Sequence, residues 1–447
     1  MLVNFRFENY LSFNNLTQFS MTTGNTRRHA KHMIKFDDVS LLKFAALYGA
    51  NASGKSNLID AIKFSRKLIL NGVPNTIARD KYCKINPSNN TRDTRFEYEI
   101  VIDEAVYAYG FSLNLYEKMI KSEWLYSLEG NKEVEIFTRS IDENKSTFNI
   151  NHQILNLNDK DRLRLEVYIE DSKALFNSLF ITDLNKNKQN LKSVNKISIL
   201  NSIFDWFNNK LEVISPDEAT SESGITYIKK DNGLALSNFL DSFGTGVKEV
   251  CTKVINEKDL YKEMPSMLVK KILEEIYNEE AEKAQALLRT PYNIHQIERT
   301  KEDLIIKTVT FKHSTEDVFY TLGEESDGTV RLVEIYDILA SNNEKVFIVD
   351  EIDRSLHPNL TYNFIKEYLK KENPGQLIVT THEDRLLDLE LLRRDEIWFV
   401  EKQDDGQSNL YSLERYRERF DKDILKAYLE GRYGSIPEFK VFNNLYS

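Results

Sequence analysis

One eight-residue stretch, Gly49 to Ser56 (GANASGKS), limits the possible fold more than any other feature of the sequence. It matches the pattern G-x-x-x-x-G-K-[ST], and it lies between an apolar run at 41–48 and a helical pattern of apolar residues that begins at Asn57. This order predicts a buried strand, a loop and a helix. Such a loop wraps its backbone N–H groups around nucleotide phosphates, and the helix N-terminus adds positive dipole beneath them.

Two side chains of this stretch have roles that the motif itself predicts. Lys55 is placed to reach the outer phosphates of a nucleotide, and the Ser56 hydroxyl is placed to ligate Mg²⁺. The plain alternative is a glycine-rich turn without a ligand, which the flanking strand and helix patterns disfavour.

An acidic pair follows a second apolar run. Val346 to Val349 is typical of a central parallel strand, and Asp350 and Glu351 come directly after it. Carboxylates at the carboxyl end of a buried strand are costly unless a cation meets them. We therefore expect Asp350 to hold Mg²⁺ through its water shell and Glu351 to orient or deprotonate the water that attacks a γ-phosphate. A strand that simply ends in an acidic turn is the alternative.

Two further segments supply polar groups of the same kind. The run from Leu377 to Thr381 predicts another parallel strand, and it ends in His382, where an imidazole can contact or sense a γ-phosphate. Ser326 and Gly328 precede a helical pattern, and small polar residues at a helix start can bind phosphate. Taken alone, these two residues are also compatible with an ordinary helix N-cap.

Composition and charge exclude several classes of protein. The formal charge of −10 argues against a protein that coats nucleic acid with its whole surface. Lys188, Lys192 and Lys196 recur at helical spacing, which leaves a local nucleic-acid contact open beside the plainer account of a solvated helix face. No apolar stretch has the length of a membrane span, and we recognise no signal peptide. Cys83 and Cys251 have no metal spacing and fit a reducing cytoplasm.

The pattern along the chain predicts three parts. Residues 1–150 carry the phosphate-binding loop and four alternating runs between Phe96 and Arg139, which predict an antiparallel β lobe. Residues 151–300 are mainly helical in periodicity, with a helix expected from Met264 to Leu288 that is charged enough to protrude as an arm or lid, or to be a plain surface helix. Residues 301–447 carry the serine and glycine at a helix start, the acidic pair and the histidine.

Several stretches together resemble a known family. GANASGKS, ESDGTVR, VFIVDEID and TTH occur in this order and resemble the Walker A, signature, Walker B with D-loop, and switch-His motifs of ABC-type ATPases of the SMC-like branch. FENYLSF, YGFSL with SEWLY, DEIDRSLHP and LEGRYGSIP resemble stand-alone bacterial AAA-family ATPases of the RloA and AbiL type. The resemblance covers most of the chain. It implies an α/β fold of the ABC-type ATPase head, with a mixed central sheet that carries the P-loop, an antiparallel β subdomain and a helical insertion.

The resemblance also implies roles for residues that align with these motifs. The residues expected to bind ATP are Gly49, Asn51, Gly54, Lys55, Ser56 and Asn57. Ser56 and Asp350 would hold Mg²⁺, Glu351 would be the catalytic carboxylate and His382 the switch. Ser326 and Gly328 would contact the γ-phosphate bound by the opposite subunit, and Asp353 falls in the D-loop. The signature differs from LSGGQ, since it keeps only the serine and the second glycine, and no Q-loop glutamine is assigned.

ATP-driven dimerisation follows from an ABC-like fold, because one chain cannot bring Ser326 onto its own P-loop. A homodimer that sandwiches two ATP molecules is therefore expected, with a higher oligomer left open. The resemblance implies a cytoplasmic sensor, regulator or scaffold of antiphage defence by abortive infection, beside a separately encoded effector such as a nuclease or Toprim-like protein. No membrane partner is implied.

Two other function classes compete with this reading. A DNA-repair or DNA-clamping ATPase of the SMC type would use the helical insertion and nucleic acid, but the insertion lacks sustained heptads and the chain is acidic. A transporter's nucleotide-binding subunit is weaker still, because about 270 residues separate the P-loop from the signature segment.

Overall fold

The computed structural model divides the chain into two compact units. The described residues are 1–26, 28–73, 79–130, 132–142, 145–155, 157–186, 198–216, 233–278, 284–290, 292–299, 303–341, 344–372, 375–416 and 424–434. Unit 1 consists of Met1–Val213, Asn343–Ile352 and Leu369–Ser447, and unit 2 consists of Ile214–Asn342 and Asp353–Tyr368. The predicted lysine stripe at Lys188, Lys192 and Lys196 lies outside the described residues. The three-part division of the chain stays a prediction.

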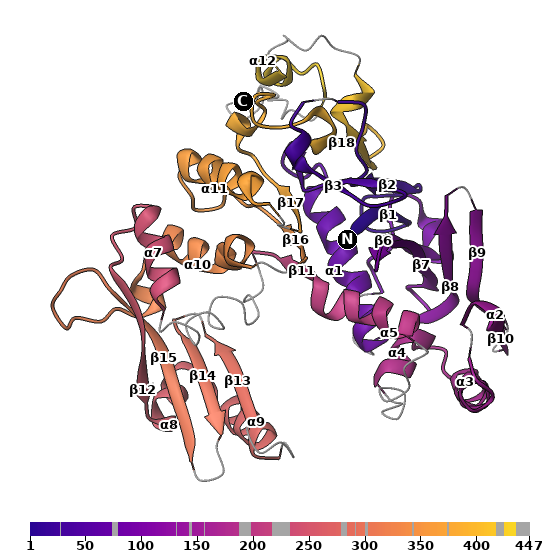
Figure 1. Cartoon of the computed structure of the whole chain (residues 1–447), viewed down its shortest axis with the longest axis horizontal. Helices are drawn as coiled ribbons and strands as arrows, with labels where there is room; N and C mark the ends of the chain where they lie inside the picture. Colours follow the sequence, from indigo (N-terminus) through magenta and orange to yellow (C-terminus); the bar gives the residue numbers. More distant parts are fainter. Residues whose placement is uncertain are drawn as a thin grey trace, which may run out of the picture. The chain divides into compact units, whose positions relative to one another are not determined.

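A mixed six-stranded sheet forms the centre of unit 1 (Figure 1). Its strands, in spatial order, are β11 (Leu211–Ile214), β16 (Val346–Val349), β17 (Gln376–Thr380), β5 (Phe44–Tyr48), β18 (Ile397–Lys402) and β19 (Ser408–Ser412). Strands β16, β17, β5 and β18 are parallel neighbours, and β19 is antiparallel to β18. The continuous apolar runs predicted as central strands are buried along their length. The predicted α/β class, with a mixed central sheet that carries the loop, is confirmed.

A second sheet in unit 1 is antiparallel throughout. Its strands, in spatial order, are β10 (Lys145–Ile150), β9 (Lys132–Asp142), β8 (Met119–Glu129), β7 (Ala105–Asn114), β6 (Thr94–Ile102), β1 (Leu2–Glu8) and β2 (Thr17–Ser20). The four alternating runs between Phe96 and Arg139 correspond to β6, β7, β8 and β9, so the predicted antiparallel β lobe is present.

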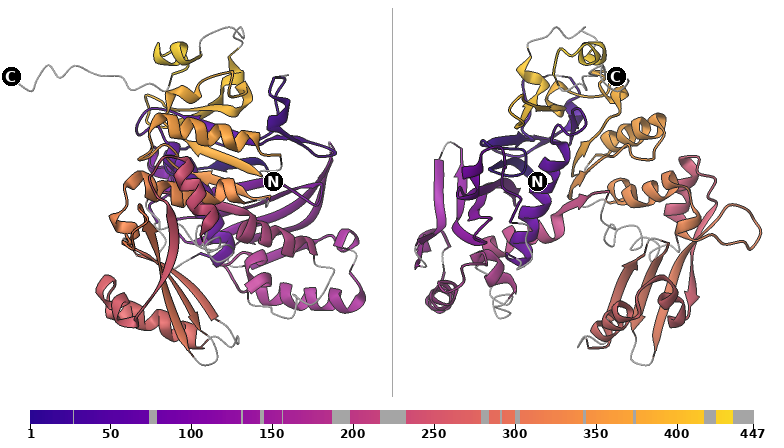
Figure 2. Two further views of the ribbon diagram at one scale, coloured as in Figure 1. Left: turned by 60° about the vertical axis from the view of Figure 1, so that its left-hand side comes forward. Right: turned by 180° about the vertical axis from the view of Figure 1, so that it is seen from behind.

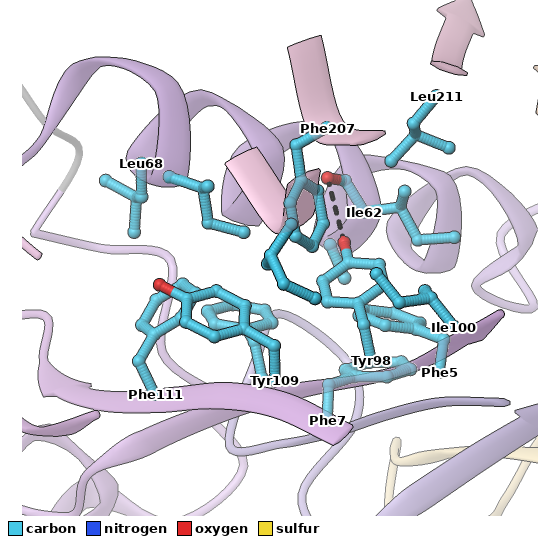
Figure 3. Packing of buried hydrophobic residues seen from close by; sticks show 14 of the residues in the cluster. Phe5, Phe7, Ile62, Leu68, Tyr98, Ile100, Tyr109, Phe111, Phe207 and Leu211 are labelled. Atoms are coloured by element: carbon cyan, nitrogen blue, oxygen red, sulfur yellow. Dashed lines mark hydrogen bonds between the residues drawn. The ribbon is translucent and has the colours of Figure 1, made fainter. Parts of the chain in front are cut away.

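Helix α1 (Lys55–Asn71) follows the P-loop and is capped by Gly72, whose positive φ of 75° suits glycine. The hydrophobic cluster around α1 combines residues of both sheets, including Ile348 and Ile378 of the mixed sheet and Tyr98 of the antiparallel sheet. Figure 3 shows the aromatic side of this cluster below the helix. The helix that follows the P-loop is therefore held by packing against residues of both sheets.

One buried tyrosine in this cluster supports a test of the packing. The Tyr98 hydroxyl is 2.6 Å from Ser65 Oγ and donates to the Ile62 carbonyl at 3.3 Å, the bond drawn in Figure 3. We expect Tyr98→Phe to lower the free energy of unfolding by about 1 kcal/mol, because a buried hydrogen bond is lost while the ring stays packed. Urea unfolding measures the change. Tyr116→Phe, at a ring that is 51% exposed, is the control, and equal effects of the two variants would contradict the role of the hydroxyl.

The helices after the antiparallel sheet belong to unit 1, and a buried carboxylate of that sheet accepts hydrogen bonds from the start of one of them. They are α3 (Asp159–Ser172), α4 (Phe180–Lys186) and α5 (Ser198–Asp205), which continues into a π-helical turn (Trp206–Lys210). The Glu123 carboxylate accepts the backbone N–H of Phe180 at 2.6 Å and of Ile181 at 3.1 Å, and it lies 3.9 Å from the Arg139 guanidinium. Burial raises the pKa of Glu123, and Arg139 opposes that shift.

Unit 2 contains a four-stranded antiparallel sheet with two helices on one face (Figure 2). Its strands, in spatial order, are β12 (Glu249–Ile255), β15 (Leu304–Lys312), β14 (Ile294–Arg299) and β13 (Ala284–Arg289). Helices α8 (Glu257–Glu263) and α9 (Ser266–Asn278) pack on Ile297 and Ile306 of the sheet. Other α-helices and strands among the described residues of the two units are β3 (Met33–Lys35), β4 (Ser40–Leu42), α2 (His152–Leu155), α7 (Leu234–Ser242), α10 (Asp327–Ala340), α11 (Pro358–Lys370) and α12 (Ile424–Leu429).

The helix expected from Met264 to Leu288 was too long. Helix α9 ends at Asn278, and Ala284–Arg289 is strand β13, which pairs with β14. Cross-strand pairing overrides the helical periodicity of this segment, since β propensity depends on the neighbouring strand. Val269, Leu273 and Ile276 of α9 are buried in the cluster that covers the four-stranded sheet. This charged helix therefore packs against the sheet of its own unit and does not protrude as a free arm.

Candidate nucleotide-binding site

Three of the predicted functional segments meet at one edge of the mixed sheet. Because β16, β17 and β5 are parallel neighbours, with Val349 opposite Val379 and Thr380 opposite Leu47, their carboxyl ends lie side by side. The P-loop follows β5, the acidic pair follows β16 and His382 follows β17. The carboxyl edge of an open α/β sheet is where such folds bind ligands.

The P-loop has a backbone that its glycines permit. Gly54 has φ 117°, and a Cβ at this position would lie 2.4 Å from Ser408 Oγ, so a side chain there would clash. The Lys55 ammonium donates to the carbonyl oxygens of Gly49 at 2.7 Å and Ala50 at 3.2 Å. The lysine therefore lies along its own loop, with only 7% of its surface exposed.

Serines from distant parts of the chain support the loop, and the sequence pattern did not reveal them. The Ser408 hydroxyl on β19 donates to the Ser53 carbonyl at 2.5 Å and is 2.8 Å from Ser12 Oγ. Asn57, predicted as a nucleotide contact, donates its side-chain N–H to Ser12 Oγ at 2.8 Å. In this structure Asn57 thus contacts the supporting serine. Asn51 is exposed at the loop tip, and Ser56 is exposed in the first turn of α1.

The acidic pair is held by a threonine on the neighbouring strand. Asp350 is 7% exposed and accepts a hydrogen bond from Thr380 Oγ1 at 2.5 Å. The same Thr380 oxygen accepts the Glu351 backbone N–H at 2.7 Å. Glu351 has φ 51°, a left-handed conformation that is rare for a residue with a side chain. Sequence reasoning missed Thr380, although its place in the stretch TTH, two residues before His382, was a usable signal.

The segment around His382 is fixed by backbone hydrogen bonds. Thr381 donates its N–H to the Leu47 carbonyl at 3.1 Å, and its hydroxyl accepts the Glu383 N–H at 2.9 Å. The Tyr48 hydroxyl donates to the Glu383 carbonyl at 3.4 Å. His382 itself is exposed at this edge. The ends of β5 and β17 are thus joined on both sides of the histidine.

The segments predicted as the signature and the D-loop belong to unit 2 and lie beside each other there. Ser326 is the N-cap of α10, because its Oγ accepts the Thr329 N–H at 3.2 Å. A Cβ on Gly328 would lie 3.0 Å from the Ser355 carbonyl oxygen, so the close approach of the D-loop favours glycine. Leu356 donates its N–H to the carbonyl of Asp353 and closes the D-loop turn at 3.1 Å. Ser326 is exposed at the start of its helix.

Comparison with protein-family models gives one match over most of the chain. Residues 44–388 match the family described as "AAA domain, putative AbiEii toxin, Type IV TA system". The chain belongs to this AAA domain family. A search of the curated proteins found no match.

Solved structures similar to this AAA-family chain include three SMC heads. One is the SMC head bound to the C-winged helix domain of ScpA, at 14% identity and TM-score 0.41, covering 92% of this chain and 97% of that chain. Another is the SMC head domain from Thermotoga maritima, at 13% identity and TM-score 0.33, covering 92% and 98%. The third is an Smc head with an extended coiled coil, bound to the C-terminal domain of ScpA derived from Pyrococcus furiosus, at 15% identity and TM-score 0.35, covering 96% and 99%. At these values the likeness supports no statement about what the chain binds.

The residues at the carboxyl edge of this AAA-family chain fit a magnesium nucleotide. Mg²⁺ prefers oxygen ligands and is commonly held by one or two protein groups together with phosphates. Ser56 offers a hydroxyl in the first turn of α1, and Asp350 offers a carboxylate whose orientation Thr380 fixes. Within the described ranges, no three His, Cys, Asp or Glu side chains lie close enough to hold a metal ion by themselves. Among the same residues, none of the helices has the length and apolar character needed to cross a membrane.

Proposed function

We propose that this AAA-family protein binds and hydrolyses ATP with Mg²⁺. One observation carries the proposal: the P-loop with Lys55, the buried Asp350 with Glu351, and His382 follow three adjacent parallel strands. In the same proposal Gly49, Asn51 and Gly54 line the phosphate-binding loop. ATPase activity follows from the chemistry of these groups when they face one triphosphate.

Each group has a distinct task in the proposed reaction. Lys55 and the P-loop N–H groups hold the phosphate oxygens, and Ser56 and Asp350 hold the metal. Mg²⁺, when bound, neutralises charge on the phosphates. The Glu351 carboxylate accepts a proton from water as the water oxygen bonds to the γ-phosphorus, and the bond to the β–γ bridging oxygen breaks so that ADP leaves. His382 contacts the γ-phosphate and reports whether it is present.

The proposal extends to a homodimer closed over ATP. Ser326 and Gly328 lie at the start of α10, and Ser326 is exposed there as the N-cap of a 14-residue helix. A helix N-terminus favours an anion, so this segment suits the γ-phosphate bound by a second copy. Asp353 of the adjacent D-loop would join the same interface. ATP then controls assembly, and hydrolysis lets the two chains separate.

Family membership supports a role in defence. The description of the family names a toxin and a type IV toxin–antitoxin system. We therefore place the chain in an antiphage, abortive-infection setting in the cytoplasm, as the sensor, regulator or scaffold of a separately encoded effector such as a nuclease or Toprim-like protein. Co-purification from the native host with and without ATP tests this part, since ATP-dependent recovery of an effector is the expected result. Recovery of the chain alone in both conditions would contradict it.

The homodimer is tested by a substitution at the signature serine. We expect Ser326→Arg to weaken ATP-dependent dimerisation at least about a hundredfold, because a large side chain obstructs the helix start that receives the partner's phosphate. Light scattering after size-exclusion chromatography measures the mass with and without ATP. Ser314→Arg, at an exposed serine of the same unit, is the matched control. A wild-type chain that keeps the mass of one copy with saturating ATP would disprove the dimer, and an unaffected Ser326→Arg dimer would remove Ser326 from the interface.

A further inference from the structure

One threonine, Thr380, makes three hydrogen bonds to the acidic segment that follows β16. Thr380 is the last residue of β17, has no exposed surface, and lies next to the turn that follows β16. Its hydroxyl donates to Asp350 Oδ1 and accepts the Glu351 N–H. Its carbonyl accepts the Ile352 N–H at 3.1 Å. Three consecutive residues are thus held by one residue of another strand.

The direction of these hydrogen bonds is fixed by chemistry. A hydroxyl has one hydrogen, and an ionised carboxylate can only accept, so the Thr380 hydrogen goes to Asp350. A backbone N–H can only donate, so the Glu351 N–H goes to a Thr380 lone pair. One carboxylate oxygen of Asp350 therefore accepts the Thr380 hydroxyl, and this bond restrains the orientation of the carboxylate.

The backbone of Glu351 needs such support. A φ of 51° at a residue with a side chain is unfavourable and persists only where surrounding contacts impose it. The hydrogen bonds donated by the Glu351 N–H and the Ile352 N–H hold the peptide groups on either side of the Glu351 Cα. Removing the Thr380 hydroxyl releases the first of them and lets the Glu351 side chain reorient.

We propose that Thr380 is a positioning residue that aligns both members of the acidic pair, Asp350 toward the metal and Glu351 toward the attacking water. This inference rests on the proposed ATPase function and deepens it. Thr380 itself touches neither ATP nor metal in this account. Its effect passes through the orientation of Asp350 and the backbone of Glu351, so it acts on turnover and metal affinity more than on ATP affinity.

The test replaces the threonine with residues of matched shape. Thr380→Val keeps the volume and removes the hydroxyl, and we expect kcat for ATP hydrolysis to fall at least about tenfold, because a hydrogen bond to a charged group is lost in the aligned site. KM for ATP should stay close to that of the wild type. Titration with Mn²⁺ in the presence of a non-hydrolysable ATP analogue, followed by electron paramagnetic resonance, should show weaker Mn²⁺ binding. Thr380→Ser should restore both values.

A control and a second variant separate the outcomes. Thr361 is equally buried, and its hydroxyl has no hydrogen-bond partner among the described residues, so Thr361→Val should leave kcat and Mn²⁺ binding unchanged. Thr380→Cys keeps a weaker donor and gives an intermediate kcat, which preserves the test if the valine variant does not fold. Wild-type kcat and Mn²⁺ binding in a folded Thr380→Val protein, or equal losses in the serine and valine variants, overturn the positioning role and leave the ATPase proposal standing. A wild-type protein that neither binds nor hydrolyses ATP overturns both.

Discussion

Replacing Lys55 by alanine is expected to remove most of the affinity for ATP. The Lys55 ammonium donates to two carbonyls of its own loop, Gly49 and Ala50, and lies within the curve of the P-loop. Triphosphate oxygens that enter the loop would take over these hydrogen bonds as charge-assisted ones. Loss of a charged donor in a buried site costs about 1.5–3 kcal/mol per hydrogen bond, so with two such bonds we expect ATP affinity to fall by about two orders of magnitude or more. Isothermal titration calorimetry with ATP and Mg²⁺ measures this.

A matched lysine on the same helix controls for loss of charge alone. Lys67 is exposed on α1, twelve positions after Lys55, and Lys67→Ala should bind ATP as the wild type does. Circular dichroism of the Lys55→Ala protein should show an intact fold, because α1 is held by the apolar cluster beneath it, to which the lysine side chain does not belong. Unchanged ATP affinity in Lys55→Ala would mean that the loop does not bind phosphate in the proposed way.

The parts of the site that could be predicted from sequence are those whose local structure is determined by residues close by in the chain. A strand, a glycine-containing loop and a helix form within about thirty residues, so Gly49 to Ser56 indicates both the local structure and its chemistry. Asp350 and Glu351 were predictable for the same reason, because they directly follow an apolar strand. Ser326 as the start of a helix was also a local inference, and the N-cap geometry of α10 agrees with it.

The supporting residues could not be predicted, because their partners are remote in the chain. Ser12 and Ser408 are separated by 396 positions, and their hydroxyls are in contact because Ser408 lies on β19 of the mixed sheet. Thr380 and Asp350 are separated by 30 positions, and a register shift of one residue in β17 would turn the hydroxyl to the other face. Strand β13 was missed for a similar reason, since its pairing with β14 decides its conformation.

Replacing Glu351 by glutamine is expected to separate ATP binding from hydrolysis. The amide keeps the size of the side chain, the capacity to hydrogen-bond a water molecule and the backbone bond to Thr380, but it cannot accept a proton from water. General-base catalysis contributes roughly 10²–10⁴-fold, so we expect turnover to fall by about that factor while ATP affinity stays near the wild-type value. Since hydrolysis is the step that lets the two chains part, the variant should remain dimeric in ATP for far longer than the wild type.

Phosphate-release kinetics and light scattering on one preparation test both halves of this expectation. Glu383→Gln is a stringent control, because Glu383 lies next to His382 at the same edge, and among the described residues its carboxylate accepts one local bond, from the Arg385 N–H. Near-normal turnover in Glu383→Gln with a large loss in Glu351→Gln would assign the base to Glu351. Wild-type turnover in Glu351→Gln would remove that residue from the chemistry. Slow turnover without a longer-lived dimer would leave Glu351 as the base and show that hydrolysis does not set the rate at which the two chains part.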